Sequence, residues 1–279
     1  MTDREAFLKT YRSVPIGYTE EKTAGTAVVR LPAFSAEPGI VHAFSTRLGG
    51  VSTGVFEGLN LSFTHDEADL VRENYRRFAA AAGIPYENMV MDRYEHGTTV
   101  LYVTEEDAGR GYLRDPLPPC DGLVTDVKGL ALVTGHADCM AFYFYDPEQE
   151  RIGLCHAGWR GALGRIGKEV LRVMTGKGSD PKNILCGVGP SICPKCFEVG
   201  DDVAELFETA FPGCPLRGVN ERGKATVDLW QVALCQFLEG GALPEHVSFM
   251  GLCTKEDHRF YSFRREGRTG GMAACLMLK

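Results

Sequence analysis

Residues 140–161, "MAFYFYDPEQERIGLCHAGWRG", decide the fold of this chain. They contain two short apolar runs, "MAFYFYD" and "RIGLCHAG", whose composition predicts β-strands. Beyond them, apolar residues recur at helical spacing from Leu163 to Met174, and Gly176 ends the pattern. This part of the sequence therefore predicts a group of strands followed by a helix.

The same signals continue on both sides of this stretch. Further strands are predicted at 26–31, 39–45, 98–103, 130–135, 184–190, 246–253 and 272–278. Helices are predicted at 66–83, at 203–210 and after Asp228, whereas residues 46–62 are rich in Gly, Ser and Thr and predict a long functional loop. Because strands occur both in runs and singly between helices, we expect an α+β fold with mixed β-sheets and outer helices. No linker or repeat divides the chain, so residues 1–279 are expected to form a single domain.

Composition restricts the class of function. The chain has 279 residues, of which 44% are hydrophobic and 24% are charged, as in ordinary globular proteins. A net charge of -7 without a basic run argues against a nucleic-acid partner. No apolar segment reaches the about 18 residues of a membrane span, and the charged N-terminus does not resemble a signal peptide. We therefore expect a cytoplasmic protein without membrane contact, whose ten cysteines are free thiols, mostly buried, with some as metal ligands.

Three segments each place a metal-binding side chain beside a glycine or at the end of a strand. They are "YEHGTTV" with His96, "GHADCMAF" with Cys139 and "LCHAGWRG" with His156. The ligands are too far apart in sequence for a zinc finger, so they would have to meet from different strands. Two imidazoles and one thiolate suit Zn²⁺, and three protein ligands leave a position open, as in catalytic sites. From the residue types alone, a hydrogen-bonded structural role is the more common one for each histidine, and Cys139 can be a buried apolar side chain or the nucleophile of a thiol hydrolase.

A set of motifs in fixed order resembles the YfiH-like family, long labelled multicopper polyphenol oxidase or laccase-domain proteins. The motifs are "HAFSTRLGGVS", "GLNLS", "HGTTV", "CDGLVT", "ADC", "HAGWRG", "GPSI", "CFEVG" and "YSFRREGRTG". The resemblance covers the chain from about His42 to the C-terminus and leaves residues 1–40 outside it. It implies one α+β domain and a Zn²⁺ ion held by His96, Cys139 and His156.

The resemblance also implies an activity. Members cleave purine nucleosides (adenosine, inosine, guanosine or methylthioadenosine) with phosphate, giving the base and a pentose 1-phosphate, and deaminate adenosine as a companion reaction. Some bacterial members are named peptidoglycan editing factors, so a non-catalytic or hydrolytic role in the quality control of cell-wall precursors is the alternative. Copper is the alternative metal, but a copper polyphenol oxidase is disfavoured because seven scattered histidines cannot build several copper sites.

Phosphorolysis requires a group that binds an anion beside the sugar. We predict that Arg47 and Arg160 bind phosphate, because guanidinium groups pair bidentately with phosphate and the neighbouring glycines let the backbone approach it. Either arginine can instead form a surface salt bridge. Asp138 is the candidate for relaying a proton or for holding a ligating imidazole, with a turn hydrogen bond as its alternative. Asn60 and Asp121 are candidates for binding a ribose hydroxyl or an inner-shell group, with loop capping as the alternative.

Three positions depart from the pattern of many family members. Tyr94 replaces Gln, Ala141 replaces Pro, and Gly271 replaces Arg, and these changes concern substrate preference more than metal binding. Cys193 and Cys196 have Cys-x-x-Cys spacing, but the sequence shows no second pair, so a metal or redox role is not favoured. Cys155 precedes His156 on a predicted strand and should face away from the site.

Overall fold

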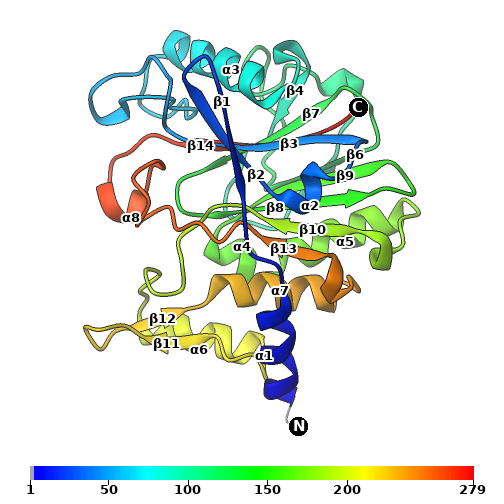
Figure 1. The fold of residues 1–279 in the computed structure, drawn as a ribbon, viewed down its shortest axis with the longest axis vertical. Helices are drawn as coiled ribbons and strands as arrows, with labels where there is room; N and C mark the ends of the chain where they lie inside the picture. The colour runs from blue at the N-terminus through cyan, green and yellow to red at the C-terminus, as the bar shows by residue number, and fades with distance from the viewer. Residues whose placement is uncertain (1–2) are drawn as a thin grey trace.

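Two six-stranded sheets lie face to face at the centre of the computed structural model, which describes residues 3–279 (Figure 1). The first sheet has the order β1-β2-β3-β14-β7-β4 and the second β13-β10-β8-β9-β6-β5. The first comprises β1 (Thr19–Thr23), β2 (Thr26–Arg30), β3 (Ile40–Ser45), β4 (Met89–Met91), β7 (Ala131–His136) and β14 (Met272–Leu278). The second comprises β5 (Val100–Tyr102), β6 (Gly122–Thr125), β8 (Met140–Asp146), β9 (Arg151–Ala157), β10 (Leu185–Val188) and β13 (Val247–Phe249).

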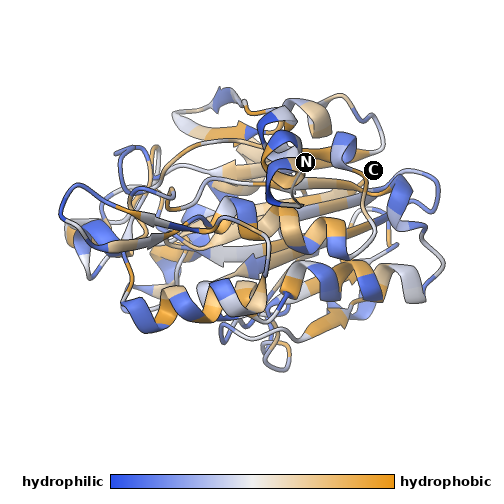
Figure 2. Ribbon diagram, turned by 90° about the horizontal axis from the view of Figure 1, so that it is seen from below, coloured by the Kyte–Doolittle hydropathy of each residue, from blue (hydrophilic) through white to orange (hydrophobic). Residues whose placement is uncertain are grey.

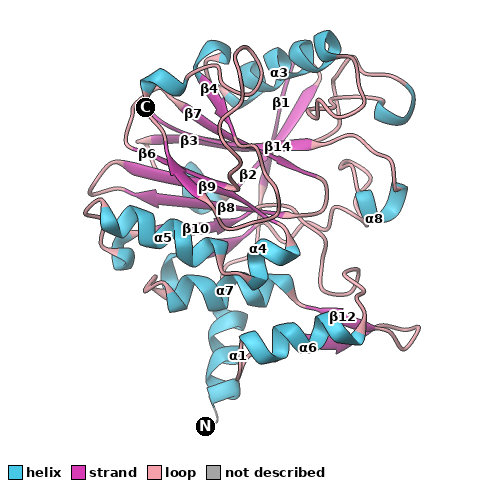
Figure 3. Ribbon diagram, turned by 180° about the vertical axis from the view of Figure 1, so that it is seen from behind, coloured by secondary structure: helices cyan, strands magenta, loops and turns pink. Residues whose placement is uncertain are grey.

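Helices cover the outer face of each sheet, giving four layers (Figures 1 and 3). Helix α3 (Ala68–Ala82) packs on the first sheet, whereas α5 (Ile166–Gly176) and α7 (Leu229–Glu239) pack on the second. The remaining elements are α1 (Asp3–Ser13), α2 (Pro32–Ser35), α4 (Trp159–Leu163), α6 (Asp201–Ala210), α8 (Phe263–Glu266), and the β11 (Arg217–Val219) and β12 (Ala225–Val227) hairpin beside α6. In Figure 2 the inner strands are mostly hydrophobic, and the hydrophilic residues gather in loops and on outer helix faces.

Strand β8 shows why the second sheet needs a layer on each side. Phe142 and Phe144 pack toward α5 and α7, whereas Tyr143 and Tyr145 pack toward the first sheet. Side chains alternate along a strand, so a strand that is apolar at every position must be buried on both faces. The run "MAFYFYD" therefore predicts a central strand.

Strands β8 and β9 pair antiparallel with Met140 opposite Ala157 and Ala141 opposite His156. The residue before β8 and the last residues of β9 consequently lie at the same end of the sheet. This register places Cys139 and His156 close together although 17 residues separate them in the sequence.

The expected α+β class is confirmed, and the predicted strands and helices occur close to their expected places. The helix expected at 163–174 is two helices, because Arg165 adopts left-handed backbone geometry (φ 67°) between α4 and α5. The polar strand β1 and the short strands β4 and β6 were not predicted. Cys214 and Cys235 form a disulfide, contrary to the expectation of free thiols only, whereas the other eight cysteines are free. Among residues 3–279, no helix is both long and apolar enough to cross a membrane.

Candidate metal centre

The structure brings His96, Cys139 and His156 together at one end of the second sheet. One ligand atom from each residue lies within 4.8 Å of those of the other two. Cys139 precedes β8, His156 stands near the end of β9, and His96 comes from the connection between β4 and β5. His96 has a positive φ of 63°, and so has Asp138, the residue before Cys139, at 88°. Such backbone strain in non-glycine residues concentrates at functional sites.

Asp121, immediately before β6, organises two of the three candidate ligands. Its Oδ1 accepts hydrogen bonds from His156 Nδ1 (3.0 Å) and from the main-chain amide of His96 (2.9 Å). Its Oδ2 accepts from the amides of Gly97 (2.8 Å) and Glu95 (3.2 Å). Because Nδ1 of His156 donates to Asp121, Nε2 of the neutral ring is the nitrogen with a free lone pair. A carboxylate behind a histidine is the usual support of a metal-binding imidazole.

The electrostatics of the cluster suit a cation better than a free nucleophile. Burial lowers the pKa of His156, which keeps the ring neutral, although the hydrogen bond that His156 donates to Asp121 opposes this effect. Burial would raise the pKa of Asp121, but the hydrogen bonds from His156 and the main-chain amides hold it below its usual value. Burial, with smaller contributions from Asp138 and Asp121, raises the pKa of Cys139 to about 12. A thiol with this pKa is protonated at neutral pH unless a positive charge such as a metal ion stabilises its thiolate.

Gly158 marks the space beside the three ligands. A Cβ atom at this position would lie 2.6 Å from Cδ2 of His96, 3.3 Å from Cε1 of His156 and 3.4 Å from Sγ of Cys139. The glycine therefore allows the three side chains to converge. The donor set of two imidazole nitrogens and one thiol sulfur, with a carboxylate behind one imidazole, fits a Zn²⁺ ion with an open position.

The cluster opens onto a cavity of about 740 Å³, a size typical of small-molecule sites. Two arginines, Arg160 and Arg264, lie in its wall. The aromatic residues in the wall are Tyr94, Trp159, Phe197 and Phe263. Arg160 also stacks on Trp159, with Cζ 4.2 Å from the ring centroid. A second cavity of about 900 Å³ adjoins the first and shares Tyr94 and Phe263 with it.

Tyr94, which departs from the family pattern, packs against the histidines. Its ring centroid lies 4.4 Å from that of His156 and 5.5 Å from that of His96. Ala141 lies opposite His156 in the β8–β9 pair, and the amide of Gly271 donates to Asn60 (2.8 Å). Of the three departures, Tyr94 is the one whose side chain packs against the imidazole rings of the candidate ligands.

Asp138 holds a loop and not an imidazole. Its Oδ1 accepts from Thr254 Oγ1 (2.6 Å), and its Oδ2 accepts from Ser262 Oγ (3.0 Å) and the amide of Arg264 (2.7 Å). Of the roles for which Asp138 was a candidate, support of a ligating imidazole is provided by Asp121, and Asp138 has a hydrogen-bonding role in a loop, close to the alternative of a turn hydrogen bond. Asp138 nevertheless forms part of the cavity wall.

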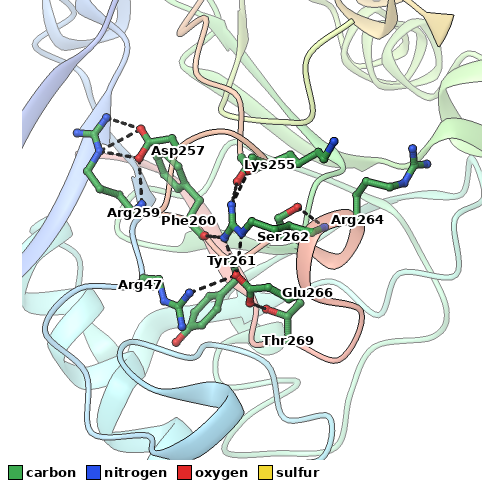
Figure 4. A network of polar contacts seen from close by, with 12 residues as sticks. Arg47, Lys255, Asp257, Arg259, Phe260, Tyr261, Ser262, Arg264, Glu266 and Thr269 are labelled. Atoms are coloured by element: carbon green, nitrogen blue, oxygen red, sulfur yellow. Dashed lines mark hydrogen bonds and ion pairs between the residues drawn. The ribbon is translucent and has the colours of Figure 1, made fainter. Parts of the chain in front are cut away.

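Arg47 lies outside the cavity wall, contrary to its expected position at the phosphate site. Its Nη1 forms an ion pair with Glu266 Oε1 at 3.3 Å, and its Cζ lies 4.4 Å from the ring centroid of Tyr261 (Figure 4). The alternative interpretation as a salt bridge is therefore the one that the structure supports. Arg264 takes a place in the wall that the sequence did not assign. The motif "YSFRREGRTG" contains three arginines, Arg264, Arg265 and Arg268, and the sequence alone does not distinguish which of them faces the cavity.

Asn60 is fully buried, so a ribose hydroxyl cannot reach it. Its Nδ2 donates to Asp66 Oδ2 (2.8 Å), and its Oδ1 accepts from the amides of Ser62 (3.0 Å) and Gly271 (2.8 Å). This is the loop-capping role. Cys155 is buried in the core between the second sheet and α5, facing away from the site as expected.

Comparisons with known proteins identify the family and the fold of the chain. The family model described as multi-copper polyphenol oxidoreductase laccase matches residues 41–279. A purine nucleoside phosphorylase of Deinococcus radiodurans is 38% identical over 91% of this chain and 94% of its own length. Adenosine deaminase RL5, from an unknown prokaryotic organism, is 32% identical over 83% of this chain and 91% of its own. The crystal structure of YlmD from Geobacillus stearothermophilus superposes with a TM-score of 0.87 at 32% identity, covering 95% of this chain and 100% of that one.

Proposed function

Since the chain belongs to the family described as multi-copper polyphenol oxidoreductase laccase, which confirms the resemblance to YfiH-like proteins, we propose that it is a zinc-dependent purine nucleoside phosphorylase. The names of its relatives support an enzyme that processes nucleosides. Phosphate as the second substrate, zinc as the metal and adenosine deamination as a side activity are our proposals.

One observation carries the proposal. The three-ligand cluster of His96, Cys139 and His156 opens onto a cavity that also contains two arginines and four aromatic rings. Three protein ligands leave one coordination position for a substrate or water, which is the catalytic form of a zinc site. Arginines suit a phosphate ion and aromatic rings suit a purine. An open metal position beside two arginines would have no evident use in a protein that only binds cell-wall precursors.

The donor set favours zinc over the copper chemistry of the family description. A laccase needs several histidine-rich copper sites. Within residues 3–279 the metal-binding groups include two histidines, both in this one cluster. His42 is buried and accepts from the amide of Leu31. His136 is buried beside the cluster, with its ring centroid 5.5 Å from that of His156, but both of its ring nitrogens have protein partners, Thr134 Oγ1 (2.8 Å) and the carbonyl of Cys139 (3.2 Å).

The residues of the cavity have separate tasks in the proposed reaction. When bound, the ion supplies Lewis-acid polarisation of a substrate oxygen or nitrogen. Arg160 and Arg264 bind phosphate and align it with the anomeric carbon of the nucleoside, which reduces the entropic cost of bringing two substrates together. Trp159, Phe197 and Phe263 contact the purine and exclude water, so that phosphate is the nucleophile. Asp121 holds His156 in the neutral tautomer that presents Nε2 to the site.

The decisive experiment incubates the zinc-loaded protein with adenosine, with and without phosphate, and separates the products. We expect adenine and ribose 1-phosphate to form only when phosphate is present. Inosine formed without phosphate would reveal the deaminase activity that the relative named adenosine deaminase suggests. If the zinc-loaded protein yields neither adenine nor inosine, and inosine, guanosine and methylthioadenosine are also left intact, the proposal is wrong.

A further inference from the structure

A second group of metal-binding side chains lies outside the proposed active site. Cys193, Cys196, Cys253 and Glu256 each offer a ligand atom, and these four atoms lie within 4.8 Å of one another. The three cysteines are free and buried, whereas Glu256 is exposed. Sγ of Cys196 lies 3.4 Å from Oε1 of Glu256. Neither the family match nor the proposed reaction gives these residues a task.

The chain builds this group from two loops that are fixed to each other. In the first loop, the amide of Cys196 donates to the carbonyl of Cys193 (3.0 Å), which closes a tight turn around the Cys-x-x-Cys pair. The second loop is joined to the first by a β-bridge between Ser191 and Cys253 and by the amide of Thr254, which donates to Ser191 (3.1 Å). Two loops thus deliver two ligands each, as in zinc sites built from paired short-spaced ligands.

The sulfur of Cys253 takes part in the contact between the two loops. The amide of Cys193 in the first loop donates to Sγ of Cys253 in the second loop (3.3 Å). This hydrogen bond holds the candidate ligands of the two loops next to each other.

We propose that Cys193, Cys196, Cys253 and Glu256 form a second Zn²⁺ site, closed by four protein ligands and structural in role. A tetrahedral site with Zn–S distances of about 2.3 Å has sulfur atoms about 3.8 Å apart, which is compatible with the observed upper limit of 4.8 Å. Three thiolates and a carboxylate are ligands that zinc accepts, and four of them leave no position for a substrate. Three thiolates, a carboxylate and one Zn²⁺ leave two negative charges, and Lys195 and Lys255 lie beside the ligands in the chain.

This second site lies against the wall of the active-site cavity. The carbonyl of Cys196 accepts a hydrogen bond from Nη1 of Arg264 (3.3 Å). Thr254, next to Cys253, donates to Asp138 (2.6 Å), and the amide of Ile192, next to Cys193, donates to the carbonyl of Asp138 (2.9 Å). An ion that joins the two loops would therefore hold Arg264 and Asp138 in place without touching a substrate.

Zinc content measured on the full chain, purified with zinc under reducing conditions, tests the proposal. We expect two zinc ions per chain in the wild type, one in Cys196→Ser and one in Cys139→Ser. Cys275→Ser is the matched control, because Cys275 is free and buried on β14 outside both groups, and it should retain two. The pairing of variants separates the two sites, so loss of the first site alone leaves this inference standing.

A second measurement keeps the proposal testable if a cysteine variant fails to fold. Glu256 is exposed, so Glu256→Gln should fold normally while its affinity for one of the two ions falls about tenfold or more in a chelator titration. Co²⁺ substitution should give a thiolate charge-transfer band that survives Cys139→Ser and largely disappears in Cys196→Ser. A wild-type protein with one zinc ion that Cys139→Ser removes entirely would overturn the proposal. So would a disulfide among the three cysteines in reduced, zinc-supplied protein.

Discussion

Replacing Asp121 with asparagine should weaken zinc binding at the His96–Cys139–His156 cluster while leaving the shape of the side chain unchanged. The carboxylate accepts four hydrogen bonds, two at each oxygen, from His156 Nδ1 and from the amides of His96, Gly97 and Glu95. An asparagine has only one oxygen. Whichever way its amide is oriented, its NH₂ group faces two donors, so two N–H groups lose their acceptor: either the buried Nδ1–H of His156 with the part-buried amide of His96, or two part-buried amides.

The number of donors that lose their acceptor sets the expected loss of stability. A donor left without an acceptor costs about 1–3 kcal/mol when it is buried and less where water can reach it, so Asp121→Asn should lower the free energy of unfolding of the metal-free protein by about 1–4 kcal/mol. If the amide faces His156, the tautomer that presents Nε2 is also no longer enforced. Loss of such support for a ligating histidine usually reduces metal affinity about 10–100-fold, equivalent to about 1.4–2.7 kcal/mol.

Zinc affinity is measured by competition with a chelator, and stability by urea unfolding of the metal-free proteins. Asp146→Asn is the matched control, because Asp146 is also fully buried and accepts from two main-chain amides, of Glu148 and Gln149, at the end of β8 opposite to Cys139. The control should keep wild-type zinc affinity even if its stability falls. A folded Asp121→Asn protein that binds zinc as tightly as the control would refute the role assigned to Asp121.

Three further outcomes are expected. Arg160→Ala and Arg264→Ala should each raise the phosphate KM of the phosphorylase reaction about tenfold or more, whereas Arg47→Ala, which removes a guanidinium outside the cavity, should leave it unchanged. Cys139 should resist iodoacetamide in zinc-loaded protein and react only slowly once the ion is stripped, because burial then keeps its thiol protonated; rapid alkylation of the loaded protein would instead identify a nucleophile. Burial, with a smaller contribution from Arg30, lowers the pKa of His42 in the folded protein to about 3. Below about pH 6.5 the unfolded chain therefore binds a proton at His42 that the folded protein does not bind. The free energy of unfolding consequently falls as the pH decreases. Between pH 7 and 5 the wild type should lose about 2 kcal/mol more than His42→Gln in urea unfolding, and equal losses would contradict this prediction.

The parts of the fold that could be predicted are those with a strong local pattern. Strand β8 is apolar at every position but the last, and α3 repeats apolar residues at helical spacing until Gly83 ends it with φ 79°. Strand β1, "TEEKT", has no such pattern, because it is an exposed edge strand held mainly by main-chain pairing with β2. Its formation depends on a partner strand, which a single segment of sequence does not reveal.

In the site, too, the residue types could be predicted from the sequence, whereas the contacts between distant segments could not. Ligand types are visible in the sequence, and the resemblance assigned His96, Cys139 and His156, which the structure places together. The supporting contacts were not visible, because they depend on which loop lies behind which strand. Asp121 and Asp138 both precede strands, yet only Asp121 faces an imidazole. Cys253 is likewise 57 residues from Cys196, so its place beside the Cys-x-x-Cys pair follows only from the packing of two loops.

The β8–β9 register determines both the packing of the core and the position of the candidate metal ligands. Side chains alternate between faces along β9, so His156 points to the site while Cys155 points into the core against α5. A slip of one residue would exchange them and bury an imidazole among Val170 and Phe142, where its nitrogens would find no partner. The apolar residues that select the correct register for the core therefore also select the face on which His156 meets Cys139. The same packing that stabilises the second sheet positions the candidate metal ligands.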